Sequence, residues 1–315
     1  MNVLVTGGAG FIGRWVVKKL LDGKHRVWVI DDFSNGSEEN IAEFLQNDDF
    51  RGLVVAGVED SKAVNELFYK NKFDVCIHAA AQINVQESID FPQKSFDSNI
   101  LGTFNVLEAA RKTNCKVVVI GTCMVYDLSS GTPISEKHEF KALSPYAASK
   151  IAAEAMAEAY FHSFGLPVVI LRPFNTFGPF QKSNMEGGVV SIFVQRKLNG
   201  ETIEIFGSGN QTRDLLFVED CAEFIVEAAF SEKAVGQVLN AGTGKDISIN
   251  DLAFLIVKDK SRVRHVKHHH PQAEINKLVC DYSKAKKVLG WKPKTKLEEG
   301  LAKTEQWLKQ QKVKK

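Results

Sequence analysis

Three side chains in the middle of the chain have types and spacing that suit proton transfer during oxidation of an alcohol. Tyr146 and Lys150 stand four residues apart in an alanine-rich, helix-forming segment, PYAASKIAAEAMAEAYF, so they share one helix face. A tyrosine has an ordinary pKa of about 10, but a neighbouring ammonium stabilises its phenolate and lowers that pKa. Thr122 follows the apolar run KVVVI and can bond the same substrate hydroxyl. The three predict a general base, Tyr146, that removes a hydroxyl proton while a hydride leaves the same carbon.

That hydride needs an acceptor, and the segment TGGAGFIG has the pattern of a dinucleotide site. Gly7, Gly10 and Gly13 follow the apolar run NVLVT at intervals of three and open a helix-forming segment. Glycines there let backbone amides and a helix N-terminus approach a pyrophosphate. Asp31, after the next apolar run, can accept hydrogen bonds from ribose hydroxyls and would repel a 2′-phosphate. The pattern predicts NAD rather than NADP, with Arg14 as a nearby cation that could instead favour a phosphate.

Strand-like and helix-like segments alternate along the chain and must position these groups. The apolar runs NVLVT, RVWVI, DVCIHAA, KVVVIGT and PVVILRP are separated by segments with helical apolar spacing. This alternation predicts an α/β fold with a doubly wound, Rossmann-like parallel sheet and a smaller, mostly helical C-terminal substrate lobe. We expect the NAD-binding lobe to comprise 1–171 plus about 213–246, and the substrate lobe 172–212 plus 247–315.

Composition excludes several other classes of protein. The chain has 315 residues and a net charge of +2, which gives no reason to expect nucleic acid as a partner. The five cysteines are scattered without a CxxC pair, so we expect a reduced, cytoplasmic protein without a structural metal. We see neither a signal peptide nor an apolar run of the ~20 residues that a membrane span needs. The adjacent histidines 268–270 are interpreted as a surface loop.

Segments spread over nearly the whole chain carry one family pattern. They are TGGAGFIG, DDFSNG, HAAAQ, SNILGTFNVLEA, YAASK, RPFNTFGP, RDLLFVED and DYSKAKKVLGW. With them the chain resembles the extended short-chain dehydrogenase/reductase family, and within it the nucleotide-sugar epimerases and dehydratases. The resemblance implies NAD as cofactor and a nucleotide sugar, with a UDP-hexose favoured, as substrate. It also implies a homodimer formed by helices near 97–113 and 146–164, which carry apolar residues on more than one face.

The resemblance further implies which residues contact the two ligands. Asn99 would support the cofactor loop, and Arg213 would hold the substrate diphosphate, a task that suits its bidentate geometry. The expected catalytic residues are Thr122, Tyr146 and Lys150. The expected cofactor-binding residues are Gly7, Gly10, Phe11, Ile12, Gly13, Asp31, Asp32, Asn35, Val58, Ala79, Ala80, Ala81, Gln82, Asn99, Tyr146, Lys150 and Pro173. The expected substrate-binding residues are Thr122, Cys123, Met124, Asn175, Val190, Phe193, Phe206, Arg213 and His270.

The chain departs from the family pattern at several ligand contacts. Phe180 stands where the family often has the arginine of G-P-R-Q, and Pro271 stands where it often has the arginine of R-P-G-E, with His270 beside it. Gly57 replaces the aspartate on the adenine side, and Leu278 occupies the position that gates the sugar. We therefore expect the phosphate and nucleotide contacts to differ from those of relatives, without an effect on the redox centre.

The residues after Thr122 separate two reactions that share oxidation at sugar C4. The 4,6-dehydratases place Asp-Glu there, for proton removal at C5 and protonation of the leaving hydroxyl, whereas this chain has Cys123 and Met124. Methionine cannot exchange a proton, and a thiol has an ordinary pKa of about 8.5. We therefore predict C4 epimerisation through a transient 4-keto intermediate. The alternatives are a dehydratase or other 4-keto chemistry using Cys123, and a non-catalytic NAD sensor, against which the intact Tyr146 and Lys150 argue.

Overall fold

A seven-stranded parallel sheet forms the centre of the protein. The structure is a computed structural model that describes residues 1–127, 133–183, 188–267 and 276–314. The strand order is β10-β6-β5-β4-β1-β2-β3, so the order reverses between β1 and β4. The strands are β1 (Asn2–Thr6), β2 (Arg26–Ile30), β3 (Phe50–Val54), β4 (Val75–His78), β5 (Lys116–Ile120), β6 (Val168–Pro173) and β10 (Val238–Ala241). Ligands of such sheets bind beyond the carboxyl ends of the strands at the point of reversal.

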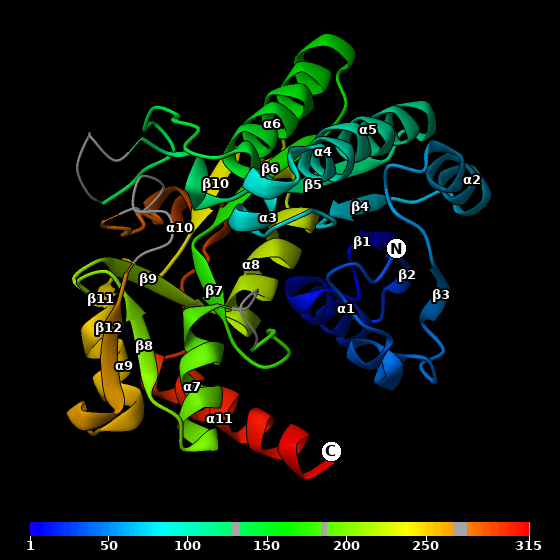
Figure 1. The fold of residues 1–315 in the computed structure, drawn as a ribbon. Coiled ribbons are helices and arrows are strands. Elements are labelled where there is room, and N and C mark those ends of the chain that lie inside the picture. The colour runs from blue at the N-terminus through cyan, green and yellow to red at the C-terminus, as the bar shows by residue number, and fades with distance from the viewer. Residues whose placement is uncertain (128–132, 184–187, 268–275, 315) are drawn as a thin grey trace.

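Alternate side chains of the central strands enter two different apolar cores. Val3 and Val5 of β1 pack in the core shared with α1 and α8, whereas Leu4 packs in the core shared with α2, α5 and α6. These helices are α1 (Phe11–Asp22), α8 (Val218–Phe230), α2 (Ser61–Asn71), α5 (Gly102–Thr113) and α6 (Pro145–Phe164). The helices cover both faces of the sheet, visible in Figure 1, and the prediction of a doubly wound fold is confirmed.

A second group of elements follows β6 and surrounds its own apolar core. It contains a three-stranded sheet, β11-β9-β7, and a parallel pair, β12-β8. The strands are β7 (Asn175–Phe177), β8 (Ile203–Phe206), β9 (Thr212–Phe217), β11 (Asp246–Ser248) and β12 (Val263–Val266). The helices are α7 (Val189–Asn199), α9 (Ile249–Val257) and α11 (Leu297–Lys314), whereas α10 (Ser283–Leu289) packs against β10 and the core shared with α1 and α8. β10 lies in the main sheet, whereas β9 pairs in the small one; the division into two lobes remains a prediction.

Short helical segments connect the longer elements. Between β4 and α5 the chain forms α3 (Val85–Asp90), α4 (Pro92–Ser95) and the π-helical segment η3 (Phe96–Leu101). Such π-helical turns occur frequently at functional sites, and η3 runs directly into α5. The described 3-10 segments are η1 (Glu38–Asn40), η2 (Ala42–Phe44), η4 (Cys123–Val125), η6 (Glu232–Ala234) and η7 (Lys260–Arg262).

The outer faces of α5 and α6 differ from the sequence interpretation. Leu107 and Tyr160, which we expected among the apolar positions of a subunit interface, pack in the core beneath these helices. Phe104 of α5 is 41% exposed and Phe164 of α6 is 56% exposed. Of the apolar residues expected on these two helices, Phe104 is therefore exposed, whereas Leu107 and Tyr160 belong to the core.

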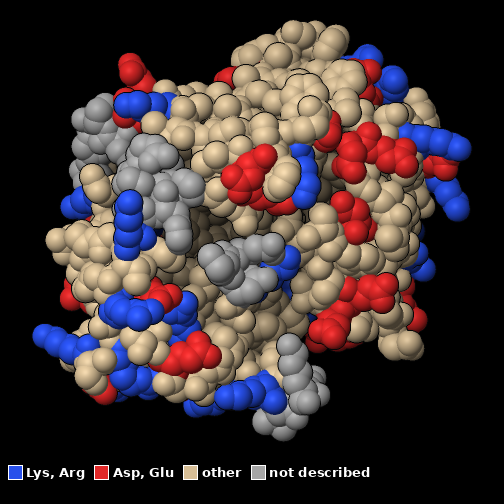
Figure 2. All heavy atoms as spheres, in the orientation of Figure 1, with Lys and Arg blue, Asp and Glu red and all other residues tan. Residues whose placement is uncertain are grey.

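The surface carries both charges. On the face drawn in Figure 2, Lys and Arg side chains lie among Asp and Glu side chains, with positive groups gathered near α7, α9 and β12. Within the described ranges, no helix combines the length and apolar character that crossing a membrane requires.

Candidate active site

The turn after β1 has no room for side chains. Gly7 has a φ of +68°, and a Cβ there would lie 2.7 Å from the backbone nitrogen of Ala80. A Cβ on Gly13 would lie 2.0 Å from the carbonyl oxygen of Gly7, and one on Gly10 would lie 3.1 Å from the same atom. Gly10 begins α1 without a side-chain cap, so the first amides of the helix point to the turn uncapped. This cradle fits a dinucleotide pyrophosphate.

Asp31 lies at the carboxyl end of β2, beside the glycine turn. Its carboxylate accepts hydrogen bonds from the amides of Ala9 at 2.8 Å and Phe33 at 2.9 Å. Burial raises its pKa, and these two amides oppose that rise. Asp32 is exposed and Asn35 is half-buried on the loop that follows. The carboxylate keeps acceptor capacity beyond the two amides, which suits ribose hydroxyls.

Arg14 does not face this ribose position. Its guanidinium forms an ion pair with Glu43, donates to the Asn40 carbonyl at 2.9 Å and lies 3.7 Å from the ring centroid of Phe180. The residue is 1% exposed, and burial lowers its pKa to about 10. Arg14, the cation that left NADP possible as a cofactor, is therefore held by contacts within the protein.

Asn99 connects the loop after β4 with the helix that carries the expected base. Its Oδ1 accepts from the Gln82 amide at 2.7 Å, and its Nδ2 donates to the Gln82 carbonyl at 3.0 Å. The same Nδ2 donates to Ser149 Oγ of α6 at 2.9 Å. The half-buried residues 79–81 lie between this anchor and β4. Asn99 therefore fixes the expected nicotinamide loop relative to Tyr146.

His78 is a buried side chain that contacts two threonines, and the sequence interpretation did not identify it as part of the site. Its Nδ1 lies 2.8 Å from Thr6 Oγ1, and its Nε2 lies 3.0 Å from Thr103 Oγ1. Thr103 donates to the Asn99 carbonyl at 2.6 Å, and the Ala80 amide donates to Thr6 Oγ1 at 3.1 Å. Burial, and then the positive charge of a nearby lysine, lower the pKa of His78 to about 3. A neutral imidazole therefore joins the glycine turn to the nicotinamide loop.

The start of α6 brings Tyr146 and Lys150 to the carboxyl end of β5. Ser144 caps this helix through the Ala147 amide, and Pro145 occupies its first turn. Lys150 Nζ donates to the Ile120 carbonyl at 2.6 Å. Thr122 accepts the Met124 amide at 3.2 Å, which begins η4. Thr122, Tyr146 and Lys150, expected to act together, are all buried at this strand end.

Burial controls the protonation of the base and its lysine. It raises the pKa of Tyr146 to about 12, and a hydrogen bond with Thr122 partly opposes that rise. Burial also lowers the pKa of Lys150 to about 8, against the effect of Glu154. The sequence interpretation expected Lys150 to lower the pKa of Tyr146. In the structure, burial dominates the pKa of Tyr146 and raises it, and the Lys150 ammonium donates to the Ile120 carbonyl.

A buried ion pair lies behind these residues and was also missed. Arg172 of β6 donates to Glu154 Oε2 from Nη2 at 2.7 Å and from Nε at 2.9 Å. Glu154 lies one helical turn after Lys150, so helix spacing alone could have indicated it. A Cβ on Gly121 would lie 2.0 Å from Glu154 Oε1, which explains the glycine before Thr122. The ion pair therefore packs against the backbone that precedes Thr122.

Cys123 packs as an apolar residue beside Thr122. It is 3% exposed and belongs to a cluster that includes Phe174, Leu278 and Cys280. Burial raises the pKa of its thiol to about 12, against the charge of Arg213, so the thiol is protonated at neutral pH. Met124 is half-buried at the edge of this cluster.

Asn175 and Arg213 lie on neighbouring strands of the small sheet. β7 pairs with β9, and Asn175 Oδ1 is a buried oxygen without a hydrogen-bond partner in the described part of the chain. A buried acceptor without a partner fits a site that receives a polar ligand. Arg213 donates to the Thr212 carbonyl at 2.8 Å, and its charge is felt at Cys123. The expected diphosphate cation therefore lies near the catalytic strand end.

The remaining expected ligand contacts differ in accessibility. Val190 and Phe193 of α7 are buried in the core of the small lobe, whereas Phe206 at the end of β8 is half-buried. Pro173 is buried at the end of β6, and Val58 is buried against α5. Phe11 and Ile12 are half-buried in the first turn of α1, and His270 lies outside the described residues.

Asp214 holds the loop behind the substrate strands and had no signal in the sequence interpretation. Its carboxylate accepts from the Thr243 amide and hydroxyl at 2.7 and 2.6 Å, the Gly244 amide at 2.9 Å and the Cys280 amide at 3.0 Å. Burial raises its pKa, and these hydrogen bonds oppose that rise. Asp214 thus joins β9 to the chain around Leu278.

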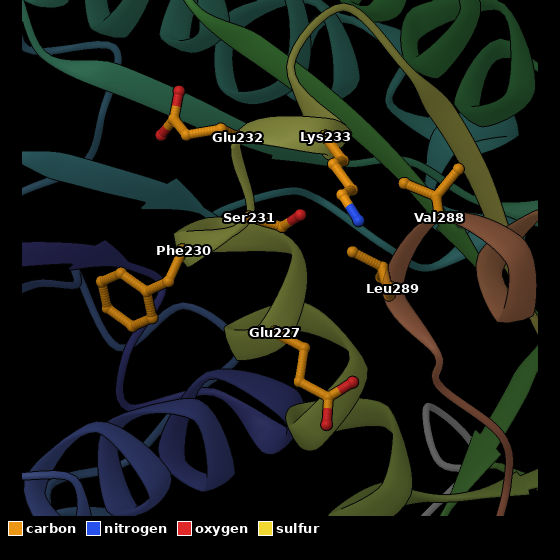
Figure 3. A pocket seen from close by; sticks show the side chains of 7 residues that line it. All are labelled: Glu227, Phe230, Ser231, Glu232, Lys233, Val288 and Leu289. Carbon is orange, nitrogen blue, oxygen red and sulfur yellow. The ribbon is translucent and has the colours of Figure 1, made fainter.

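A hollow of about 470 Å³ lies away from this region, between the end of α8, η6 and α10. Figure 3 shows Lys233 and Leu289 pointing toward one another across it, and the residues expected to bind ligands do not line it. The part of the chain that the structure describes contains no group of three His, Cys, Asp or Glu side chains suited to a metal ion.

The glycine turn after β1, Asp31 after β2 and the Thr122, Tyr146 and Lys150 group after β5 lie beyond the carboxyl ends of the sheet, an arrangement that fits a dinucleotide-dependent enzyme of the short-chain dehydrogenase type. The family model described as GDP-mannose 4,6 dehydratase matches residues 4–304. A UDP-glucose 4-epimerase of Mycolicibacterium smegmatis is 36% identical over 307 residues, covering 96% of this chain and 97% of the relative. The chain belongs to the extended short-chain dehydrogenase/reductase family of nucleotide-sugar epimerases and dehydratases.

Solved structures agree with this family. The structure of Pal from Bacillus thuringiensis has a TM-score of 0.97 and 52% identity, covering 99% of this chain and all (100%) of that one. A UDP-glucose 4-epimerase of Thermotoga maritima, solved with UDP-glucose, has a TM-score of 0.91 and 32% identity over 99% of each chain. A UDP-glucose 4-epimerase of Thermus thermophilus, solved with NAD, has a TM-score of 0.88 and 31% identity, covering 98% of this chain and 99% of that one. NAD is the cofactor of this group.

Proposed function

We propose that this protein epimerises a nucleotide sugar at C4, with a UDP-hexose as the favoured substrate, through a transient 4-keto sugar. The observation that carries the proposal is the pair after Thr122: a buried, protonated thiol at Cys123 and a methionine at 124. A 4,6-dehydratase needs an acid and a base at that place. An epimerase needs neither, because the keto sugar has only to turn its other face to the hydride donor.

The residues of the site divide the reaction between them. NAD, when bound at the glycine turn and Asp31, would supply a reversible acceptor for the C4 hydride. Tyr146 takes the proton of the C4 hydroxyl, Thr122 orients that hydroxyl, and the Lys150 ammonium stabilises the phenolate. Hydride return to the other face and proton return from Tyr146 complete the cycle, so no atom is gained or lost. Asn175 and Arg213 would hold the substrate's sugar and diphosphate during the turn.

Support for UDP comes from the names of similar proteins, since the Thermotoga maritima structure contains UDP-glucose. We place the enzyme in the cytoplasm as a proposal, because its five cysteines are free and buried, as in a reducing compartment. Turnover should be screened with UDP-glucose, UDP-N-acetylglucosamine, UDP-glucuronate, and dTDP- and GDP-sugars. Bound NAD without turnover of any of these would favour an NAD sensor.

Turnover in D₂O tests the epimerase against the dehydratase. Hydride moves between C4 and the cofactor without exchange with solvent, so the product should be a C4 epimer without deuterium at C5. A dehydratase must remove the C5 proton and protonate the product from solvent, which leaves deuterium on carbon. Deuterium at C5 or a 6-deoxy-4-keto product would overturn the proposal.

Cys123→Ala sharpens the same test. A small packing residue can be shortened with most of the rate retained, whereas loss of a catalytic base costs about 10²-fold or more. Cys280→Ala is the matched control, because that thiol lies in the same apolar cluster. A rate that collapses for Cys123→Ala alone, together with deuterium at C5, would make this cysteine the catalytic group.

A further inference from the structure

Phe180 has a strained backbone in the loop between β7 and α7. Its φ is +70°, a value that bulky residues rarely adopt. Such a backbone conformation costs free energy and persists only where the surrounding structure enforces it. The surroundings are aromatic and cationic. The ring lies 3.7 Å from the Arg14 guanidinium, 5.0 Å from the centroid of Trp307 and 6.0 Å from that of Trp15. We call Arg14, Trp15, Phe180 and Trp307 the aromatic clasp.

One side of the clasp holds the segment around the ribose carboxylate. Arg14 donates to the Asn40 carbonyl at 2.9 Å, and Asn40 Nδ2 donates to the Ala9 carbonyl at 2.7 Å. The Ala9 amide in turn donates to Asp31 at 2.8 Å. Three consecutive hydrogen bonds therefore connect Arg14 to Asp31, the carboxylate expected to bind the NAD ribose.

The other side of the clasp holds the substrate segment. Trp15 Nε1 of α1 donates to the Pro179 carbonyl at 3.1 Å, next to Phe180. Gln181 Nε2 donates to the Thr176 carbonyl at 3.0 Å, beside Asn175 with its unpaired oxygen. Trp307 belongs to α11, whose residue Gly300 lies against the ring of a phenylalanine in β7. The clasp thus joins α1 of the cofactor side to the strand that carries Asn175.

The two central members are chemically matched. A second cation at position 180 would face the buried Arg14 guanidinium. An aromatic face at 180 instead attracts that guanidinium. The contact between Arg14 and Phe180 therefore holds the centre of the clasp together.

From these contacts we propose that the aromatic clasp couples the two binding sites: NAD bound at Asp31 positions the Asn175 segment for the nucleotide sugar, with Arg14 and Phe180 as positioning residues. The inference rests on the proposed function, because a nucleotide sugar is the second ligand. By linkage, the nucleotide must then tighten NAD binding by the same factor as NAD tightens nucleotide binding.

Titration calorimetry of NAD, without and with saturating UDP, measures this coupling and needs no turnover. For the wild type we expect UDP to tighten NAD binding by at least about fivefold, within the roughly 5- to 150-fold usual for coupled sites. Phe180→Ala, Phe180→Leu and Arg14→Met should each reduce the factor to below about twofold. Phe180→Leu keeps apolar bulk and fold but removes the aromatic face. The double variant Arg14→Met/Phe180→Ala should lose no more than either single variant.

Phe254→Ala is the matched control, because this exposed phenylalanine lies beside Lys260 in a cation–aromatic contact within the small lobe alone. Phe254→Ala should keep the factor by which UDP tightens NAD binding in the wild type.

If the clasp variants also keep this coupling factor, or if the wild type binds UDP without any coupling, the clasp proposal is wrong and the proposed function is unaffected. A wild type that binds NAD but none of UDP, dTDP and GDP would overturn both.

Discussion

Tyr146, the proposed general base, must work against its own burial. Burial raises its pKa to about 12, and a hydrogen bond with Thr122 opposes that rise. We predict that Tyr146→Phe lowers kcat by about 10²- to 10⁴-fold, because the ring still packs but the proton acceptor is gone. NAD affinity should stay within about twofold of wild type by calorimetry. Tyr160→Phe on the same helix removes a hydroxyl bonded to Glu108 and should keep kcat; equal losses in both variants would reassign the base.

His78 should make stability depend on pH. Its pKa falls to about 3 in the folded protein from about 6.5 when unfolded, so the unfolded chain binds more protons between these values. The contribution of a neutral His78 is therefore complete above about pH 6.5 and is lost as pH falls toward 3. The free energy of unfolding, measured by urea unfolding, should rise with pH between pH 4 and 6. His78→Gln should lower that slope by about 1.4 kcal/mol per pH unit, because about one fewer proton is then bound on unfolding. The exposed His162→Gln should keep the slope; an unchanged slope for His78→Gln would contradict the buried neutral state.

At the scale of elements, the turn between β1 and α1 depends on close backbone contact. A Cβ on Gly13 would lie 2.0 Å from the Gly7 carbonyl oxygen, a contact that only movement of the helix can relieve. We predict that Gly13→Ala weakens NAD binding at least about tenfold and destabilises the fold by about 1–3 kcal/mol, as overpacking does. Calorimetry and urea unfolding provide the two measurements. Gly52→Ala in β3, whose Cβ would lie 3.6 Å from Trp28, should leave NAD affinity unchanged.

The same turn shows which parts of the site a sequence can predict. Gly7, Gly13, Asp31 and the Tyr146 segment act through short spacings along the chain, so their types and intervals indicated both the cofactor and the base. The partner of Glu154 could not be predicted, because Arg172 reaches this residue of α6 from the strand β6. Asp214 was missed for the same reason, since its four hydrogen bonds reach residues 243, 244 and 280. Nothing local distinguishes such a carboxylate from a solvated one.

Fold and function were predictable to different depths for a related reason. Strand and helix alternation determines the doubly wound sheet, because each amphipathic segment has to bury one face. The strain at Phe180 and the core position of Leu107 depend on which segments meet in space. The prediction of an epimerase followed from the residue types at Cys123 and Met124, whereas the burial of Cys123, which supports it, depends on segments that meet in space.

At the scale of the whole molecule, the exposed apolar residues of η3, α5 and α6 predict a homodimer. Phe96, Leu101 and Phe104 are 51%, 37% and 41% exposed, and Phe164 is 56% exposed on α6, which packs beside these elements. Apolar groups gathered on neighbouring helices favour association, because contact removes them from water. We expect light scattering at micromolar concentration to give twice the mass of one chain.

Phe104→Glu should shift the protein to monomers, because a charge would be buried unpaired in the contact. Phe254→Glu, at a phenylalanine that is 48% exposed on α9, should remain dimeric. A monomeric wild type, or two variants that dissociate alike, would show that this surface is not the subunit contact.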